Sequence, residues 1–366
     1  MKISCPPIDI SGSYPQNASM EKTNFPLSDN EKNFFSQNID IFCCPKCGSD
    51  LIFNNEHIDC SNCHQHYQVF EGIPSFFLPN NWDSSKEDVT EIIKSFYEKT
   101  PFPNYDEFDN VGSLIDKAKK GVFAKLLDDQ IPFGTRILEC GCGTGQLTNF
   151  LSVASRTVIG TDICMNSLKM ATEFKEANDL KRAHFYQMNL FLPCFKPHSF
   201  DLVISNGVLH HTSDPFLAFK SISNLVKPNG YILIGLYHKY GRLATDLRRK
   251  IFNLTKDKLK ILDRHATDKD ISQAKKDAWF LDQYKNPHES KHTVGEVLHW
   301  LDCTGFTFIQ SIPKTVPFKS VTQSERLFKP DKLGNKFERF IVNIGMVFKG
   351  HREGGFFIII AKKSKT

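Results

Sequence analysis

Short apolar runs of strand length alternate with stretches of helical period through most of the chain beyond residue 130. The runs expected to be strands cover residues 136–139, 157–162, 184–187, 200–206 and 231–236. The helical period between them covers residues 146–153, 166–177 and 216–226. One run, 200–206, is apolar almost throughout, as a strand buried on both faces should be. The alternation predicts a doubly wound α/β fold on a mostly parallel sheet.

The flanks of this region carry further helix and strand signals. Before it, apolar residues recur at helical spacing over residues 84–99 and 114–127. After it, Thr293 is placed to cap a helix that ends near Gly305. Two more strands and a helix between them are expected at residues 306–312, 356–362 and 336–348. Residues 1–39 are rich in Ser, Asn and Pro without a sustained period, which predicts a flexible leader.

Two Cys-x-x-Cys pairs follow the leader. Cys44 and Cys47 form the first pair, and Cys60 and Cys63 form the second, twelve residues further on. Each pair suits two ligands of one tetrahedral ion, and four sulfurs leave no open position for water, so we expect a structural Zn²⁺. A redox pair or a disulfide framework is the alternative, and the neighbouring Cys43 and His64 are substitute ligands.

Composition places the chain among ordinary globular proteins. It has 366 residues, of which 40% are hydrophobic and 24% charged, enough for one large domain and a small one. No apolar run approaches the roughly 20 residues of a membrane helix, and no signal peptide is apparent. We therefore expect no membrane insertion and a cytoplasmic location. Residues 238–292 hold 14 Lys or Arg against 8 Asp or Glu, a surplus suited to phosphate or to ordinary solvated helix faces.

The most specific stretch lies where the first run of the alternating region ends. Glu139 is followed by glycines at 141, 143 and 145, and then by a helix, so the segment is expected to form strand, glycine turn and helix. Such a turn brings backbone close to a ligand and exposes helix N–H groups. Asp162 closes the second strand, where a carboxylate can accept bonds from both hydroxyls of a ribose. Gly141, Asp162, Asn189 and Asn206 all fall at strand ends, where such sheets bind ligands.

At these residues the chain resembles the class I S-adenosylmethionine-dependent methyltransferases. The acid followed by G-x-G-x-G, the acid after the second strand, and the turn at 226–230 carry the resemblance, and the His-His loop at 207–215 resembles the small-molecule branch. The resemblance implies a seven-stranded sheet whose last two strands pair antiparallel at its edge. It also implies S-adenosylmethionine held by Glu139, Gly141, Cys142, Gly143, Gly145, Asp162, Ile163, Asn189, Leu190 and Asn206.

A second resemblance concerns the cysteine segment. Residues 44–78 resemble the small zinc-ribbon proteins that bind and activate methylating enzymes, here fused to the enzyme. We expect the ribbon to staple the fold or dock a protein partner, with direct substrate recognition as the alternative. The expected division of the chain is a leader at 1–39, the ribbon at 40–80, cofactor-covering helices at 84–130, and the methyltransferase domain at 131–366 with a lid at about 237–292.

The resemblance also suggests residues on the substrate side. Tyr97 and Tyr105 are expected to lay a ring against the sulfonium, with simple packing as the alternative for each. His210 and His211 are candidates for a general base. The lid candidates for substrate contact are Asp282, Tyr284, His288 and His292.

Three functions remain open on the sequence. The favoured one is methyl transfer to an O, N or C nucleophile of a small-molecule or glycan-pathway substrate. The second is RNA methylation, supported by the ribbon and the basic surplus. Residues 206–209 lack the Pro-Pro-aromatic run of enzymes that methylate RNA amino groups, which counts against that mechanism. The third is a scaffold without catalysis, which the intact glycines and Asp162 make the least favoured.

Overall fold

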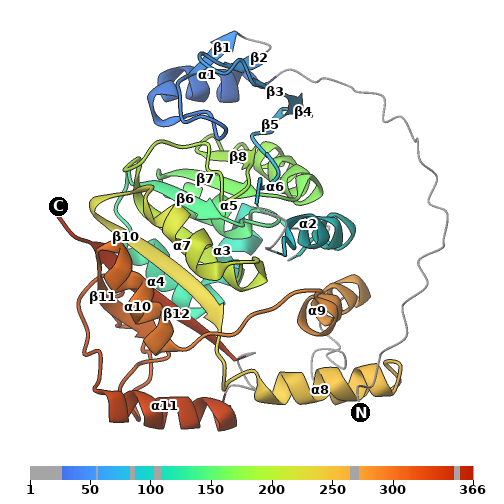
Figure 1. The fold of residues 1–366 in the computed structure, drawn as a ribbon, viewed down its shortest axis with the longest axis vertical. Coiled ribbons are helices and arrows are strands. Elements are labelled where there is room, and N and C mark those ends of the chain that lie inside the picture. Colours follow the sequence, from blue (N-terminus) through green and yellow to red (C-terminus); the bar gives the residue numbers. More distant parts are fainter. Residues whose placement is uncertain are drawn as a thin grey trace.

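The computed structural model describes residues 27–54, 57–82, 87–102, 109–263, 272–349 and 355–365. Its centre is one twisted sheet with helices on both faces, and the cysteine-containing segment lies at one end of the sheet (Figure 1). The strand order is β11-β12-β10-β9-β6-β7-β8. The strands are β6 Arg136–Cys140, β7 Thr157–Asp162, β8 Ala183–Gln187, β9 Phe200–Asn206, β10 Val226–Tyr237, β11 Phe306–Ile312 and β12 Phe356–Lys363.

The sheet is mostly parallel, as expected. Strands β6 to β10 pair parallel, whereas β12 pairs antiparallel with both β10 and β11. Strand β10 begins earlier than expected: the turn at 227–230 is a bulge between its first residue and the run from Tyr231. The chain therefore has the predicted doubly wound, seven-stranded fold, with its parallel strand ends at a common edge.

The sheet is buried because its strands are apolar on both faces. One core includes Leu138 and Val203 and contacts α7 (Pro215–Ser223) and α10 (Val294–Thr304). The other core, on the opposite face, includes Ile137 and packs under α4 (Val122–Gln130) and α5 (Gln146–Ser152). A third cluster holds α6 (Met165–Ala177) against β8. Burial of both faces fixes the register of these strands.

The helices before β6 differ from the expected pair. Helix α2 covers Thr90–Lys99, and the stretch expected as one helix at 114–127 is two helices, α3 (Val111–Lys120) and α4. The expectation of a single helix is wrong because Gly121 takes an extended conformation between them. Glycine stabilises a helix interior poorly, so the break falls there.

The segment read as a leader is structured where it is described. Helix α1 (Asp29–Gln37) and a short turn at Ile39–Ile41 precede the cysteines, and Phe35 is almost fully buried against Phe42 and Phe76. A flexible leader reaching residue 39 is therefore wrong for residues 29–39, because the apolar side chains of α1 complete a core that it shares with the sheet. Residues 1–26 lie outside the described part of the chain.

The cysteine segment is joined to the sheet by backbone as well as side chains. Its strands are β1 Leu51–Asn54, β2 His57–Cys60, β3 His66–Tyr67, β4 Val69–Phe70 and β5 Ile73–Pro74. The Phe76 N–H donates to the Gln187 carbonyl at 2.8 Å, which extends the edge beyond β8. On the other side, the Cys43 N–H donates to the Cys194 carbonyl at 2.9 Å. The segment is thus docked on the main domain at two places.

The insertion after β10 forms two helices, α8 (Leu243–Leu254) and α9 (Gln273–Lys285), separated by a short turn at Lys260–Leu262. Helix α11 (Lys336–Lys349) lies between β11 and β12 in the chain. Figure 1 shows α8 and α11 at the end of the molecule opposite the cysteine segment. Within the described ranges, no helix is both long and apolar enough to cross a membrane.

Candidate functional site

A cavity of about 570 Å³ lies at the carboxyl ends of the parallel strands. One part of its wall comes from the glycine turn and the ends of β7 and β8, and another from α2, α9 and the end of β10. Of the expected cofactor residues, those that line it are Tyr97, Glu139, Gly141, Cys142, Gly143, Asp162, Ile163, Asn189, Leu190 and Asn206. The topology therefore brings together residues from five separate stretches of sequence.

The glycine turn is required by close packing as well as by its backbone angles. At Gly141, φ is +76°, and a Cβ would come within 2.3 Å of the Val208 side chain. At Gly145, φ is +73°, and a Cβ would clash with Ala171 and Phe185 at 2.6 and 2.8 Å. Gly145 does not line the cavity, and it packs against α6 and β8.

Asp162 is held by the backbone of the glycine turn. One carboxylate oxygen accepts from the Gly143 N–H at 2.9 Å, and the other accepts from the Cys164 N–H at 2.8 Å. Burial raises the pKa of this carboxyl, although these N–H donors oppose the rise. Each oxygen keeps a second lone pair, so the fixed carboxylate can still accept two hydroxyl donors from a ligand.

Glu139 lies under the turn with only 6% of its surface exposed. Burial raises its pKa to about 8, although the Thr148 hydroxyl donates to one of its oxygens at 2.5 Å. The nearby Asp162 adds to the rise. At neutral pH the carboxyl is therefore mostly protonated, and a cationic group in the cavity would draw it toward the charged form.

Asn189 is more heavily bonded than a simple ligand contact requires. Its amide nitrogen donates to the Asn80 side-chain oxygen at 2.8 Å and to the Leu78 carbonyl at 2.9 Å. Its own oxygen accepts from the Phe191 N–H at 3.1 Å. Both amide donors are used within the protein, so a ligand can reach this side chain only through the second lone pair of its oxygen.

The other end of the cavity is a polar network surrounded by aromatic rings. The Tyr97 hydroxyl donates to Asp282 at 2.8 Å and accepts from the Asn286 amide at 2.9 Å. Asp282 also accepts from the Gln283 amide at 2.8 Å, and that amide donates at 2.8 Å to the Tyr237 hydroxyl. Asp282, a lid candidate, therefore lies at the cavity wall and ties α9 to α2. Tyr105 lies outside the described residues.

The two adjacent histidines have different environments. His211 lines the cavity, and its Nδ1 lies 2.8 Å from the His288 carbonyl. A carbonyl can only accept, so Nδ1 carries the proton and Nε2 presents a lone pair. Burial lowers the pKa of His211, although Asp282 opposes the shift. His211 is thus neutral at physiological pH, with its basic nitrogen available.

His210 does not face the cavity. It is fully buried, its ring lies 4.1 Å from the Tyr237 ring, and neither ring nitrogen has a hydrogen-bond partner among the described residues. Burial lowers its pKa well below the ordinary value. Of the two candidates for a general base, only His211 lines the cavity, because the turn at Leu209–His211 directs the two rings differently.

Three lid candidates lie away from the cavity wall. Tyr284 packs against Phe252 and Phe280 between α8 and α9. His292 is bonded to Ser290 and to Glu296, each at 2.8 Å. His288 contributes its backbone carbonyl, which fixes His211. The helical phase of α9 explains the Tyr284 position, because only one side of the helix faces the cavity.

The cavity includes residues that the sequence patterns did not single out. They are Phe102, Gln283 and Phe356, together with Trp279 and Tyr237. Trp279 and Asp282 are three residues apart on α9, so helical spacing from Asp282 would have found the first. Gln283 directly follows Asp282 on the same helix, whereas Phe102, Tyr237 and Phe356 come from distant segments and had no local signal.

The cysteine cluster fits a metal. The sulfurs of Cys44, Cys47, Cys60 and Cys63 lie within 4.8 Å of one another. Tetrahedral Zn²⁺ with Zn–S bonds of about 2.3 Å places its sulfurs roughly 3.8 Å apart, so little movement is needed. Cys43 is buried and lies outside the cluster. The Tyr67 hydroxyl lies 2.9 Å from the Cys44 sulfur, where it can donate to a metal-bound thiolate.

The strand order and the flanking helices are those of the Rossmann-like methyltransferase fold. Residues 138–234 match the family described as methyltransferase domain. The match includes the glycine turn, Asp162 and the His-His loop.

Curated relatives cover part of the chain. An uncharacterized protein of Synechococcus sp. is 26% identical over 251 residues, which span 61% of this chain and 60% of that protein. An uncharacterized methyltransferase of Mycobacterium bovis is 33% identical over 132 residues, 36% of this chain and 62% of that protein. The chain thus spans about three-fifths of the length of these relatives. The solved magnesium protoporphyrin IX methyltransferase of Synechocystis, with bound SAH, aligns over 75% of this chain and 99% of its own, at 15% identity and a TM-score of 0.44.

Proposed function

We propose that the chain is an S-adenosylmethionine-dependent methyltransferase that acts on a hydroxyl or amine of a small, largely apolar acceptor. The observation that carries the proposal is the continuity of one cavity from the glycine turn and Asp162 to His211 and Asp282. The first end suits a nucleoside cofactor, and the second combines a neutral histidine with aromatic walls.

The residues at the first end fit the cofactor. Asp162 would accept the ribose hydroxyls, and Gly141 and Gly143 would let the backbone approach without a Cβ. Glu139 would balance positive charge at the methionine end. When bound, S-adenosylmethionine supplies a methyl group made electrophilic by its sulfonium.

The chain's own work is then alignment, exclusion of water and removal of a proton. The rings of Tyr97, Phe102 and Trp279 would hold the acceptor and keep water out. The lone pair of His211 Nε2 would take the proton that the acceptor atom loses. Asp282 and Tyr97 keep each other in place beside that nitrogen through their hydrogen bond.

A small acceptor is favoured over RNA by the cavity wall itself. Among the described residues that line it there is no Lys or Arg, so the wall offers no cation to a phosphate. Among the described residues of the insertion, basic side chains lie on α8, on α9 and in the turn after α8, away from this wall.

We further propose that the four cysteines hold a structural Zn²⁺. Its support is the close approach of four sulfurs in a segment whose small size calls for a staple. The docking of that segment on β8 favours a role in supporting the main domain.

The proposal is tested by isothermal titration of the purified full chain with S-adenosylmethionine, followed by methyl transfer from the labelled cofactor to a panel of small hydroxy and amino aromatics and to total cellular RNA. Cofactor binding that Asp162→Ala abolishes, with label in small molecules only, is expected. Label in RNA would overturn the assignment of the acceptor. Failure to bind the cofactor would overturn the activity itself.

A further inference from the structure

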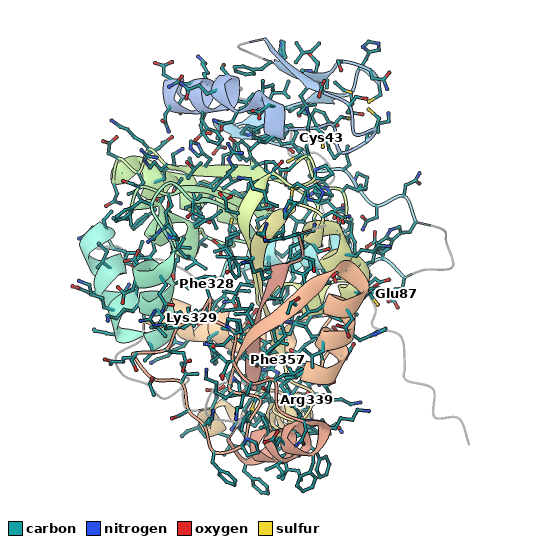
Figure 2. All side chains as sticks on the ribbon, turned by 90° about the vertical axis from the view of Figure 1, so that its left-hand side faces the viewer. Cys43, Glu87, Phe328, Lys329, Arg339 and Phe357 are labelled. Carbon is teal, nitrogen blue, oxygen red and sulfur yellow. The ribbon has the colours of Figure 1, made fainter. Side chains whose placement is uncertain are left out.

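The proposed function makes no use of the end of the molecule opposite the cysteine segment. Figure 1 shows α8 and α11 there, and Figure 2 shows α11, with Arg339 labelled, at the same end in a perpendicular view. Large apolar side chains are exposed on this end, which we call the apolar end surface: Leu247, Leu254, Ile261, Phe337, Phe340 and Phe348. Four of them are more than 65% exposed. An exposed apolar patch of this kind marks a contact with another body.

Helix α11 is oriented with its apolar stripe outward. Phe337, Phe340, Ile344 and Phe348 follow helical spacing and are between 45% and 71% exposed. The side that faces the protein carries Asn343, whose side-chain oxygen accepts from His238 Nε2 at 3.0 Å, and the buried Met346. A helix on a globular protein normally buries its apolar stripe. The outward stripe of α11 therefore needs a covering outside the described chain.

The charge of the residues around the apolar stripe indicates what kind of partner contacts it. Residues 243–262, which span α8 and the turn after it, contain six Lys or Arg and two Asp. Both acids are paired with lysines elsewhere: Asp246 with Lys291 at 2.5 Å, and Asp257 with Lys285 at 2.9 Å. Of the six cations, Arg249 is paired with the buried Glu289 at 2.9 Å, and Lys250, Lys256 and Lys258 are exposed. Helix α11 adds Lys336 and Arg339 against Glu338. The end surface is thus apolar and positively charged together.

We propose that the apolar end surface docks on an anionic lipid bilayer, with α8 and α11 lying in the plane of the interface. Phenylalanine and leucine on one side of a helix with lysine and arginine beside them are the composition of interfacial helices. Anionic headgroups attract such basic segments. Protein interfaces, in contrast, are depleted in lysine, which this surface carries at 250, 256, 258 and 260.

Docking would place the lid at the membrane. Helix α9 packs on α8 through Phe252, Phe280 and Tyr284, and its other side carries Trp279 and Asp282 in the cavity wall. An acceptor dissolved in the bilayer would then reach the cavity along the lid. The docking itself does not depend on the proposed methyl transfer, so the two can fail separately.

The test is co-sedimentation of the full chain with vesicles of phosphatidylcholine alone and of phosphatidylcholine with phosphatidylglycerol. Binding to the anionic vesicles that weakens with salt is expected, at least tenfold stronger than to the neutral ones. The double variant Phe337→Ser, Phe340→Ser should lose at least tenfold in binding, and Lys256→Glu with Lys258→Glu should lose the preference for anionic lipid. The matched control is Phe133→Ser, because Phe133 is 77% exposed in the turn before β6, outside α8 and α11.

Folding of each variant is checked by its thermal melt, which exposed positions should leave unchanged. No binding to either vesicle, equal binding to both, or binding that Phe337→Ser, Phe340→Ser leaves intact would overturn the proposal. Light scattering that shows a dimer, made monomeric by the same variant, would overturn it in favour of a second copy of this chain.

Discussion

The Asn189 amide lies 2.8 Å from the Asn80 side-chain oxygen, across 109 residues of sequence. Asn189 is at a strand end in the cavity wall, whereas Asn80 follows the cysteine segment. The Asn80 amide donates in turn to the Thr90 hydroxyl at 3.0 Å, and Thr90 also lines the cavity. Asn80 therefore fixes two residues of the cavity wall, Asn189 and Thr90, although it does not line the cavity itself.

Asn80→Ala is expected to weaken cofactor binding by roughly tenfold, because loss of a buried hydrogen-bond partner costs about 1–3 kcal/mol. Isothermal titration with S-adenosylmethionine measures the change. Asn81→Ala is the matched control, since Asn81 is exposed. Equal affinity in Asn80→Ala and the control would mean that the wall is rigid without this residue.

Removal of metal should act on the same wall. A full equivalent of zinc is expected by mass spectrometry, and a chelator should lower both the melting temperature and the affinity for cofactor, because the ribbon shares a core with the sheet. Cys47→Ser should reproduce the effect. Cys303→Ser, which alters an exposed cysteine outside the cluster, should not. A metal-free protein with unchanged melting and binding would contradict a structural role.

His211→Gln is expected to lower kcat by about 10²–10⁴-fold with little change in cofactor affinity, because the proton acceptor is lost while the cavity remains. Because the pKa of His211 is lowered, its neutral form persists below pH 6.5. The fall of kcat on the acid side of a pH–rate profile should therefore begin below pH 6.5. His299→Gln, at an exposed position, is the control. Loss of binding with kcat intact would make His211 a packing residue.

The strand-and-helix alternation was sufficient to predict the sheet. Strand β9 and strand β11 have the expected bounds, because continuous apolar runs between turns have few alternatives. The prediction of a flexible leader was wrong for residues 29–39 because their local pattern is weak. Helix α1 has few apolar residues, and Phe35 is fixed by contacts with Phe42 and Phe76 that no local pattern reveals.

The residues of the candidate site likewise fall into those with a sequence signal and those without one. The position of Asp162 at the cavity could be predicted because the topology dictates where strand ends meet. The lid was predicted only as a region, since which of Asp282 and Tyr284 faces the cavity depends on how α9 packs. The hydrogen bond between Asn189 and Asn80 joins segments 109 residues apart and had no signal in the sequence.

Cofactor affinity should rise with pH until about 8. Burial raises the pKa of Glu139 to about 8, so below that value a cation can bind beside it only with release of a proton. Titrations from pH 6.5 to 9 in buffers of different ionisation enthalpy would reveal that release. Glu139→Gln should bind more weakly at pH 8.5 and show no such rise, and a wild-type affinity independent of pH would contradict this assignment.

Glu31 tests how α1 is joined to the sheet. Its carboxylate is paired with Lys175 and lies 2.9 Å from His184 Nδ1, and all three side chains are buried. Burial alone would raise its pKa, but His184 and Lys175 together lower it to about 2. A group with a lowered pKa stabilises the folded state above pH 4.5, its ordinary pKa, and this stabilisation is lost as the pH falls toward 2.

Glu31→Gln is therefore expected to reduce the free energy of unfolding by about 3–5 kcal/mol at pH 7, because it leaves the buried Lys175 unpaired. The difference from wild type in urea titrations should shrink below pH 4.5. Asp29→Asn, on the same helix but fully exposed, should leave stability unchanged. A Glu31→Gln effect that is small, or the same at pH 3 and pH 7, would show that the ion pair does not anchor α1.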